Sequence, residues 1–114
     1  MTIEKSVEMS GSGWASVTVK AVLPGDRVAV VRVNRQLKEV RFHGRATVRV
    51  LSDTPCADWH GFFHDTTSAH VFESVSVALV ELGLSADAAA CLSAYARNGV
   101  HDARQFALVA DFNS

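Results

Sequence analysis

The amino-acid sequence predicts an α+β domain, in which a four-stranded antiparallel meander is followed by two to three helices packed on one face. Three observations support this fold class. The first half alternates apolar and polar residues with a period of two, which is typical of half-buried strands. The turns between these stretches are too short for the crossover that parallel neighbours need. The second half carries apolar residues at helical spacing between capping residues.

The strands are predicted from this alternation and from the turn residues between them. Val17 and Val19 point one way, for example, while Ser16 and Thr18 point the other. The ranges expected to form strands are 14–23, 27–33, 37–43 and 45–51. Residues 1–13 show no clear period, so we expect a flexible tail there, although they could add an edge strand. Residues 14–114 then form a single α+β domain.

The helices are predicted from apolar spacing and from their end signals. A short helix is expected over 55–60, and the two to three packed helices are expected within 67–82, 85–99 and 103–111. Thr67 or Ser68 can cap the second helix, and Gly83 stands where a residue with positive φ commonly follows a helix. Gly99 is expected to end the third helix. The small residues 88–90 favour close packing within the chain over a homodimer interface, although a homodimer stays open.

Composition and charge narrow the function classes. The formal net charge of −1 gives no overall attraction to nucleic acid or to anionic membranes. No stretch approaches the roughly 20 apolar residues of a membrane span. Cys56 and Cys91 are too few for a disulfide scaffold. The N-terminus does not read as a secretory signal, so we expect a cytoplasmic protein with reduced thiols.

The charge is distributed unevenly along the chain. Residues 9–50 hold eight basic residues against two acidic ones, and residues 51–114 hold two basic residues against eight acidic ones. Alternation predicts that Arg41, Arg45 and Arg49 share the solvent face of the sheet, with Lys20 and Arg32 nearby. We expect this basic face to bind an acidic protein surface. If the acidic helices cover that face instead, the asymmetry reflects pairing within the fold.

Nucleic acid is the alternative partner for the same basic strands. Sheet-based RNA readers stack bases on aromatic side chains, and only Phe42 and His43 are interleaved with these charges. The helical segment is mostly acidic, which is unsuited to a recognition helix. Nucleic-acid binding therefore ranks second.

The segment 53–70 concentrates residues that can bind a metal or act in catalysis. In a helix, Cys56, His60 and His64 would share one face, and His70 or Asp65 could complete a tetrahedral Zn²⁺ site. Cys56 could instead be a nucleophile with His60 as its base. The glutamate of zinc proteases and any oxyanion-hole motif are missing from the sequence. Metal binding is therefore a further alternative, and a non-enzymatic role is favoured over catalysis.

Three aromatic residues, Trp59, Phe62 and Phe63, have helical spacing in the same segment. They could anchor a partner, but most large aromatics in so small a domain are buried, so we expect them in the core. Together these observations predict a small non-catalytic interaction protein, such as an adaptor, regulator or inhibitor.

Overall fold

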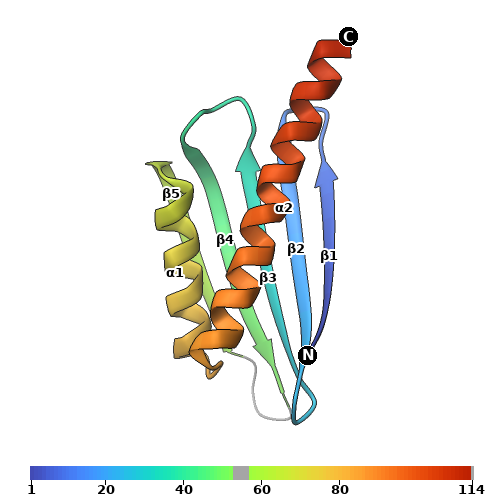
Figure 1. Cartoon of the computed structure of the whole chain (residues 1–114). Coiled ribbons are helices and arrows are strands. Elements are labelled where there is room, and N and C mark those ends of the chain that lie inside the picture. The colour runs from blue at the N-terminus through green and yellow to red at the C-terminus, as the bar shows by residue number, and fades with distance from the viewer. Residues whose placement is uncertain (53–56, 114) are drawn as a thin grey trace.

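The computed structural model describes residues 1–52 and 57–113, with side chains except at residues 57 and 106–113. A five-stranded antiparallel sheet forms one layer, and two helices cross one of its faces as a second layer (Figure 1). The elements are β1 Thr2–Met9, β2 Trp14–Leu23, β3 Arg27–Gln36, β4 Phe42–Leu51, β5 Ala57–Thr66, α1 Ser68–Glu81 and α2 Ala86–Asn113. The α+β class is confirmed, with five strands in place of four. Within the described ranges, no helix is both long and apolar enough to span a bilayer.

Strand β1 occupies the segment for which the sequence predicted a flexible tail or an edge strand. All eight of its residues pair with β2, from Thr2 opposite Val22 to Met9 opposite Ala15. The following turn ends at Gly13, whose φ of +85° suits a glycine. The N–H of Trp14 donates to the hydroxyl of Ser10 at 3.2 Å, which closes the hairpin.

Strand β4 replaces two predicted strands. The strand expected over 37–43 is wrong, because residues 37–41 form a turn and β4 begins at Phe42. The Arg35 side chain explains this turn, since its guanidinium donates to the carbonyls of Glu39 and Val40 at 3.5 and 3.1 Å. An irregularity in the β4–β5 register lies between Phe42 and Gly44. A Cβ at Gly44 would overlap the carbonyl of Asn34, so the backbones approach closely there.

Strand β5 replaces the helix predicted over 55–60. Residues 57–66 are extended and pair with β4, while residues 53–56 lie outside the described part of the chain. The side chains of Trp59 and Phe63 pack against the core, and Gly61 between them leaves them room. A Cβ at Gly61 would lie 2.5 Å from the Trp59 ring. The aromatic side chains therefore follow strand periodicity rather than helical periodicity.

Helix α1 has the ends that the sequence predicts. The Thr67 hydroxyl accepts from the N–H of His70 at 3.1 Å, so Thr67 is the N-cap. After the C-cap Leu82, Gly83 has a φ of +109°. The N–H of Gly83 donates to Val80 and that of Leu84 to Leu79, which is the hydrogen-bond pattern of a Schellman motif.

Helix α2 is continuous from Ala86 to Asn113, so the predictions that Gly99 ends a helix and that another begins near 103 are wrong. Gly99 instead marks a close approach of α2 to β2. A Cβ at Gly99 would lie 2.6 Å from Cγ1 of Val17. Ala89, Ala96 and Ala103 are buried on the same helix. Of residues 88–90, for which the sequence predicted packing within the chain, Ala89 is buried and Ala88 packs partly against the core, whereas Ala90 is exposed.

The core lies between the helices and one face of the sheet. Alternate residues of β2, β3 and β4 are fully or almost fully buried there; they are Val17, Val19, Ala21, Leu23, Ala29, Val31, Val33, Ala46, Val48 and Val50. Helix α1 packs on β4 and β5, and α2 packs on β1, β2 and β3. Both helices therefore cover the same side, and the opposite face of the sheet carries no helix of the described chain.

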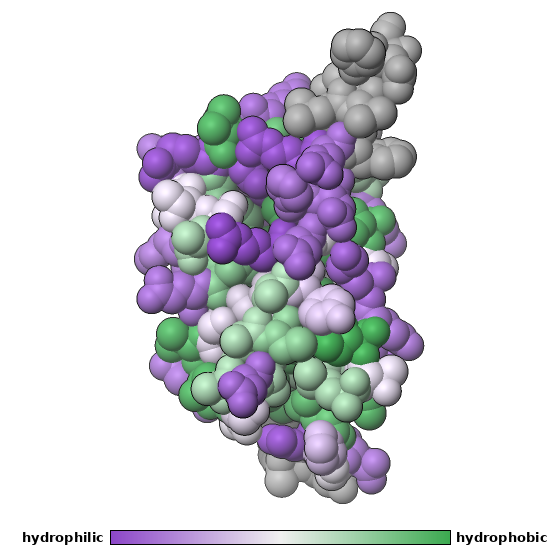
Figure 2. Space-filling model, viewed as in Figure 1, coloured by the Kyte–Doolittle hydropathy of each residue, from purple (hydrophilic) through white to green (hydrophobic). Residues whose placement is uncertain are grey.

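The outer surface of the helical layer is mixed in character. Figure 2 shows apolar side chains gathered in the lower half of this view and hydrophilic ones over the middle of α2, below the atoms drawn in grey. Val77, Val80 and Tyr95 are exposed on the helices, at 53, 47 and 44%. Single exposed apolar residues are ordinary on a protein surface.

Replacing Gly99 with alanine tests the close approach of α2 to β2. Overpacking against Val17 lowers the free energy of unfolding by about 1–3 kcal/mol, and the higher helix propensity of alanine offsets about 1 kcal/mol of this loss. We expect the free energy of unfolding to fall by roughly 1 kcal/mol in urea titration. In a Val17→Ala background, Gly99→Ala should be neutral or stabilising. An equal loss in both backgrounds would contradict the packing argument.

Candidate binding face on the uncovered side of the sheet

The uncovered face is formed by the side chains that alternate with the core residues. Antiparallel pairing arranges them in rows across the strands. One row runs through Glu8, Ser16, Asn34, Arg45 and Phe62, which are successive partners on β1 to β5. The face therefore combines acidic, hydroxyl, amide, basic and aromatic groups.

The predicted basic face is present only in part. Arg45 and Arg49 are four residues apart, so they lie on the same face of β4, and both are exposed. Arg41 lies in the turn before β4, because that strand begins only at Phe42. Lys20 and Arg32 are exposed on β2 and β3 and share the face with Arg45. The helices pack on the other side, so they do not cover these charges.

Two of the predicted arginines are neutralised by carboxylates of β5. Arg49 lies opposite Asp58 and makes two parallel contacts of 3.0 Å with its carboxylate. Arg41 forms an ion pair of 2.7 Å with Asp65 and also donates to the Asp65 carbonyl. The charge asymmetry of the sequence is thus partly internal pairing, between arginines near or in β4 and acids of β5. Exposed pairs of this kind stabilise the fold little.

Lys20, Arg32 and Arg45 form a diagonal across β2, β3 and β4. Arg32 is opposite Thr18, two residues from Lys20, and Arg45 is opposite Asn34, two residues from Arg32. Diagonal neighbours of this type are roughly 7–8 Å apart. None of the three forms an ion pair with any described residue, including Glu4, the cross-strand partner of Lys20. We call these three residues the basic diagonal.

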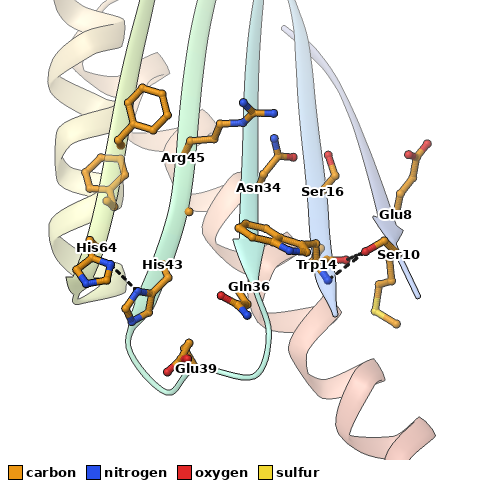
Figure 3. A pocket seen from close by; sticks show the side chains of 15 residues that line it. Glu8, Ser10, Trp14, Ser16, Asn34, Gln36, Glu39, His43, Arg45 and His64 are labelled. Atoms are coloured by element: carbon orange, nitrogen blue, oxygen red, sulfur yellow. Dashed lines mark hydrogen bonds between the residues drawn. The ribbon is translucent and has the colours of Figure 1, made fainter. Parts of the chain in front are cut away.

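A groove of about 870 Å³ lies at the end of the face near the 37–41 turn. Trp14 lines it from β2 and Phe62 from β5, with 40 and 82% of their surfaces exposed. Between them lie Ser16, Asn34 and Arg45. Figure 3 shows Trp14 reaching across the sheet toward β3 and Arg45 extending toward Asn34. The groove therefore joins one end of the basic diagonal to two exposed aromatic rings.

Two histidines line the same groove on β4 and β5. The Nδ1 atoms of His43 and His64 are 3.0 Å apart, and their rings are nearly perpendicular, at 81°. One Nδ1 donates a hydrogen bond and the other accepts it, so the acceptor ring has an unprotonated Nδ1. This contact joins β4 to β5 beside the register irregularity at Phe42 and Gly44.

The metal-site prediction required a helix through His60 and His64, but this segment is a strand. His60 and His64 lie on strand β5, where residues four apart are separated by roughly 13 Å. His70 lies on α1, and its ring contacts Phe63, a side chain packed against the core. Cys56 lies outside the described residues. Among the residues that the structure describes, no group of three or more His, Cys, Asp or Glu side chains could hold a metal ion.

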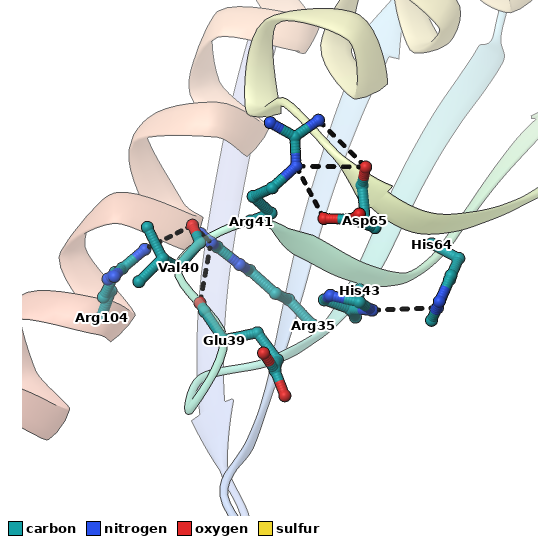
Figure 4. A network of polar contacts seen from close by, with 8 residues as sticks. All are labelled: Arg35, Glu39, Val40, Arg41, His43, His64, Asp65 and Arg104. Atoms are coloured by element: carbon teal, nitrogen blue, oxygen red, sulfur yellow. Dashed lines mark hydrogen bonds and ion pairs between the residues drawn. The ribbon is translucent and has the colours of Figure 1, made fainter.

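Arg35 on β3 points away from the basic face and is buried under the helices, with 4% of its surface exposed. Its guanidinium lies over the Phe42 ring at 5.3 Å. Arg104 also donates to the Val40 carbonyl, at 3.2 Å (Figure 4). Burial, and secondly the Arg104 charge, lower the pKa of Arg35. The Nε atom of Arg35 has no hydrogen-bond partner among the described residues. Arg35 therefore fixes the turn beside the groove and takes no part in the exposed face.

The aromatic prediction is confirmed for two residues and wrong for one. Trp59 and Phe63 pack against the core, whereas Phe62 points away from it because strand neighbours alternate. The sequence argument also missed Trp14 as a surface group. The two faces of β5 could have been predicted from alternation along this segment. One face carries Trp59, Gly61 and Phe63, and the other carries His60, Phe62 and His64.

Comparison with known proteins gives no relative for this chain. No known protein family, curated protein or solved structure matches it. The function proposed below therefore rests on the geometry and charge of the uncovered face.

Replacing Arg35 with methionine tests its role in the turn. The carbonyl of Glu39 loses its donor, and a hydrogen bond to a charged group contributes about 1.5–3 kcal/mol. We expect a loss of about 2 kcal/mol in the free energy of unfolding and faster hydrogen exchange of amides 37–42. Arg32→Met, on the exposed side of the same strand, should change stability by less than about 0.5 kcal/mol. Unchanged stability and exchange in the Arg35 variant would contradict this role.

Proposed function

We propose that the protein is a small non-catalytic interaction protein, such as an adaptor, regulator or inhibitor, that binds an acidic protein surface. The binding surface is the uncovered face of the sheet. The observation that carries the proposal is the basic diagonal of Lys20, Arg32 and Arg45, whose charges are exposed and form no ion pair with a described residue. A complementary acidic surface would supply the missing counter-charges and steer association.

The five basic residues predicted from the sequence do not contribute equally to this proposal. Arg41 and Arg49 already have carboxylate partners on β5. An incoming acid would have to compete with Asp65 and Asp58 for them. Binding to the basic diagonal requires no such competition with a described carboxylate. The proposal therefore depends on Lys20, Arg32 and Arg45.

The groove adds residue types that often dominate protein–protein binding energy. Tryptophan and arginine are enriched among such positions, particularly where a partner can exclude water. Trp14 and Arg45 line one groove, and Phe62 is the most exposed large apolar residue of the described chain. Phe62 is not an isolated apolar residue, because Trp14 lines the same groove, and exposed apolar groups that gather at one site can mark a protein-binding site.

Single-stranded nucleic acid is the second candidate partner. The observation that favours it is the presence of Trp14 and Phe62 on the basic face, since exposed aromatics stack with bases. The sequence argument considered Phe42 and His43, and Phe42 is buried. Glu8 and Glu39 line the groove as well, and their charges would oppose a phosphate backbone. The protein partner therefore ranks first.

Reversing the charges of the basic diagonal tests the first candidate. We expect wild-type protein to capture a partner from host lysate that the triple variant Lys20→Glu, Arg32→Glu, Arg45→Glu does not. Capture should weaken as salt rises, because exposed charges are screened. Arg97→Glu, an exposed change on α2, is the matched control and should bind as the wild type does. Equal capture by wild type and triple variant would reject the basic diagonal as the binding surface.

Nuclease treatment of the lysate separates the two candidates. A protein partner should still be captured after treatment. Direct titration of labelled single-stranded DNA or RNA at low salt provides the second measurement, since phosphate contacts bind most tightly there. We expect no saturable binding at micromolar protein. Salt-sensitive binding that the triple variant loses would instead establish nucleic acid as the partner.

A further inference from the structure

The groove has the dimensions of a site for a short peptide segment. Across the sheet, Trp14 on β2 and Phe62 on β5 are three interstrand spacings apart, or roughly 14 Å, and Trp14 lies two residues along β2 from the row that contains Phe62. An extended chain covers this distance with about four residues, at roughly 3.3 Å each. The groove volume of about 870 Å³ lies within the range of sites that enclose small ligands.

The apolar part of the groove offers a place for one large side chain. The Trp14 ring lies over the sheet toward β3 (Figure 3). Gly44 also lines the groove and adds no side chain to it. Phe62 stands at the far wall and is 82% exposed. An apolar side chain placed between these groups would cover aromatic surface that now faces water.

The polar part of the groove is asymmetric in charge. Arg45 lies toward β5, beside Phe62, and forms no ion pair with any described residue. Glu8 lies at the opposite end on β1. Ser16 and Asn34 lie between them and offer hydrogen bonds to a peptide backbone. A carboxylate therefore fits at the Arg45 end and is repelled at the Glu8 end.

We propose that this groove binds an extended segment of about four residues from the protein partner, in which a large apolar side chain lies next to an aspartate or glutamate. The apolar side chain packs between Trp14 and Phe62, and the carboxylate pairs with Arg45. The proposal rests on the proposed function and identifies the kind of partner segment. Charge complementarity selects this occupant over a nucleotide, whose phosphates would also meet Glu8 and Glu39.

Peptide selection on the full chain tests the proposal. Random heptapeptides displayed on phage are selected on the wild-type protein. We expect the selected peptides to share an aspartate or glutamate within two residues of a Trp, Phe, Tyr, Leu or Ile. Their dissociation constants are then measured as synthetic peptides by the fluorescence of Trp14 in a Trp59→Phe background.

Variants of the groove locate the bound peptide. We expect Arg45→Glu and Phe62→Ala each to raise the dissociation constant at least tenfold, and Trp14→Ala to do the same by calorimetry. Val22→Ala, an exposed change at the other end of β2, and Arg97→Glu on α2 should change it less than twofold. Thermal unfolding of each variant, followed by circular dichroism, checks that it folds. Because the changed side chains are exposed, the variants should retain the fold.

Four results would overturn the proposal. The selection yields no peptide that depends on Trp14 and Arg45, or it yields basic peptides. If binding of the peptides depended on Lys20 and Arg32 alone, the proposed function would stand but the groove would not be its site. If twelve-residue oligo(dT) displaced the peptides and were sensitive to the same variants, the occupant would be nucleic acid. If sedimentation showed a dimer that Phe62→Ala dissociates, the occupant would be a second copy of the chain.

Discussion

The close approach of Gly99 on α2 to Val17 on β2 is the constraint on which the arrangement of layers depends. A Cβ at Gly99 would lie 2.6 Å from the Val17 side chain, so the helix can lie this near only because glycine stands there. Ala96 and Ala103 continue the same small, buried surface along α2. One long helix can therefore cover three strands while α1 covers the other two. All the helical surface is used on one side, and the other face of the sheet is left for solvent or for a partner.

The sequence predicts those parts of the fold whose signals are local. Strand β2 follows from its own alternation, and α1 follows from its apolar spacing, Thr67 and Gly83. Strand β1 lacks such a signal because nearly all of its residues are exposed; it is held by pairing with β2 and by a Lys5–Asp102 contact of 3.2 Å. In β5 the spacing of His60 and His64 suits either a helix or a strand, and only pairing with β4 decides between them.

The proposed binding face is likewise predictable only where its signals are local. Lys20 and Arg45 lie on strands whose alternation is clear, so the sequence indicates which face each occupies. Arg32 lies on β3, whose apolar residues fall on both faces, and only the pairing of β3 with β2 and β4 places it between the other two. Arg41 is misplaced because the buried Arg35 binds the carbonyls of residues 39 and 40 and turns the chain there. The pairing of Arg49 with Asp58 depends on the register between β4 and β5, which is set by contacts distant in sequence. Local patterns thus locate the charges, and long-range pairing decides which of them are compensated.

In the proposed function, this compensation determines which kind of partner the uncovered face selects. Asp65 and Asp58 neutralise Arg41 and Arg49, whereas Arg45, which also lies beside β5, forms no ion pair with a described residue. Glu4 and Glu8 face outward from β1 at the other border. The positive charge is therefore confined to a diagonal between two borders that carry acidic residues. A broad polyanion laid across the whole face would meet repulsion from Glu4 and Glu8 and only compensated arginines beside Asp58 and Asp65, whereas a narrow acidic segment along the diagonal would meet uncompensated positive charge. The same residues that reduce the net charge of the face are therefore what leads us to propose a short acidic segment of a protein, and not an extended phosphate backbone, as the partner.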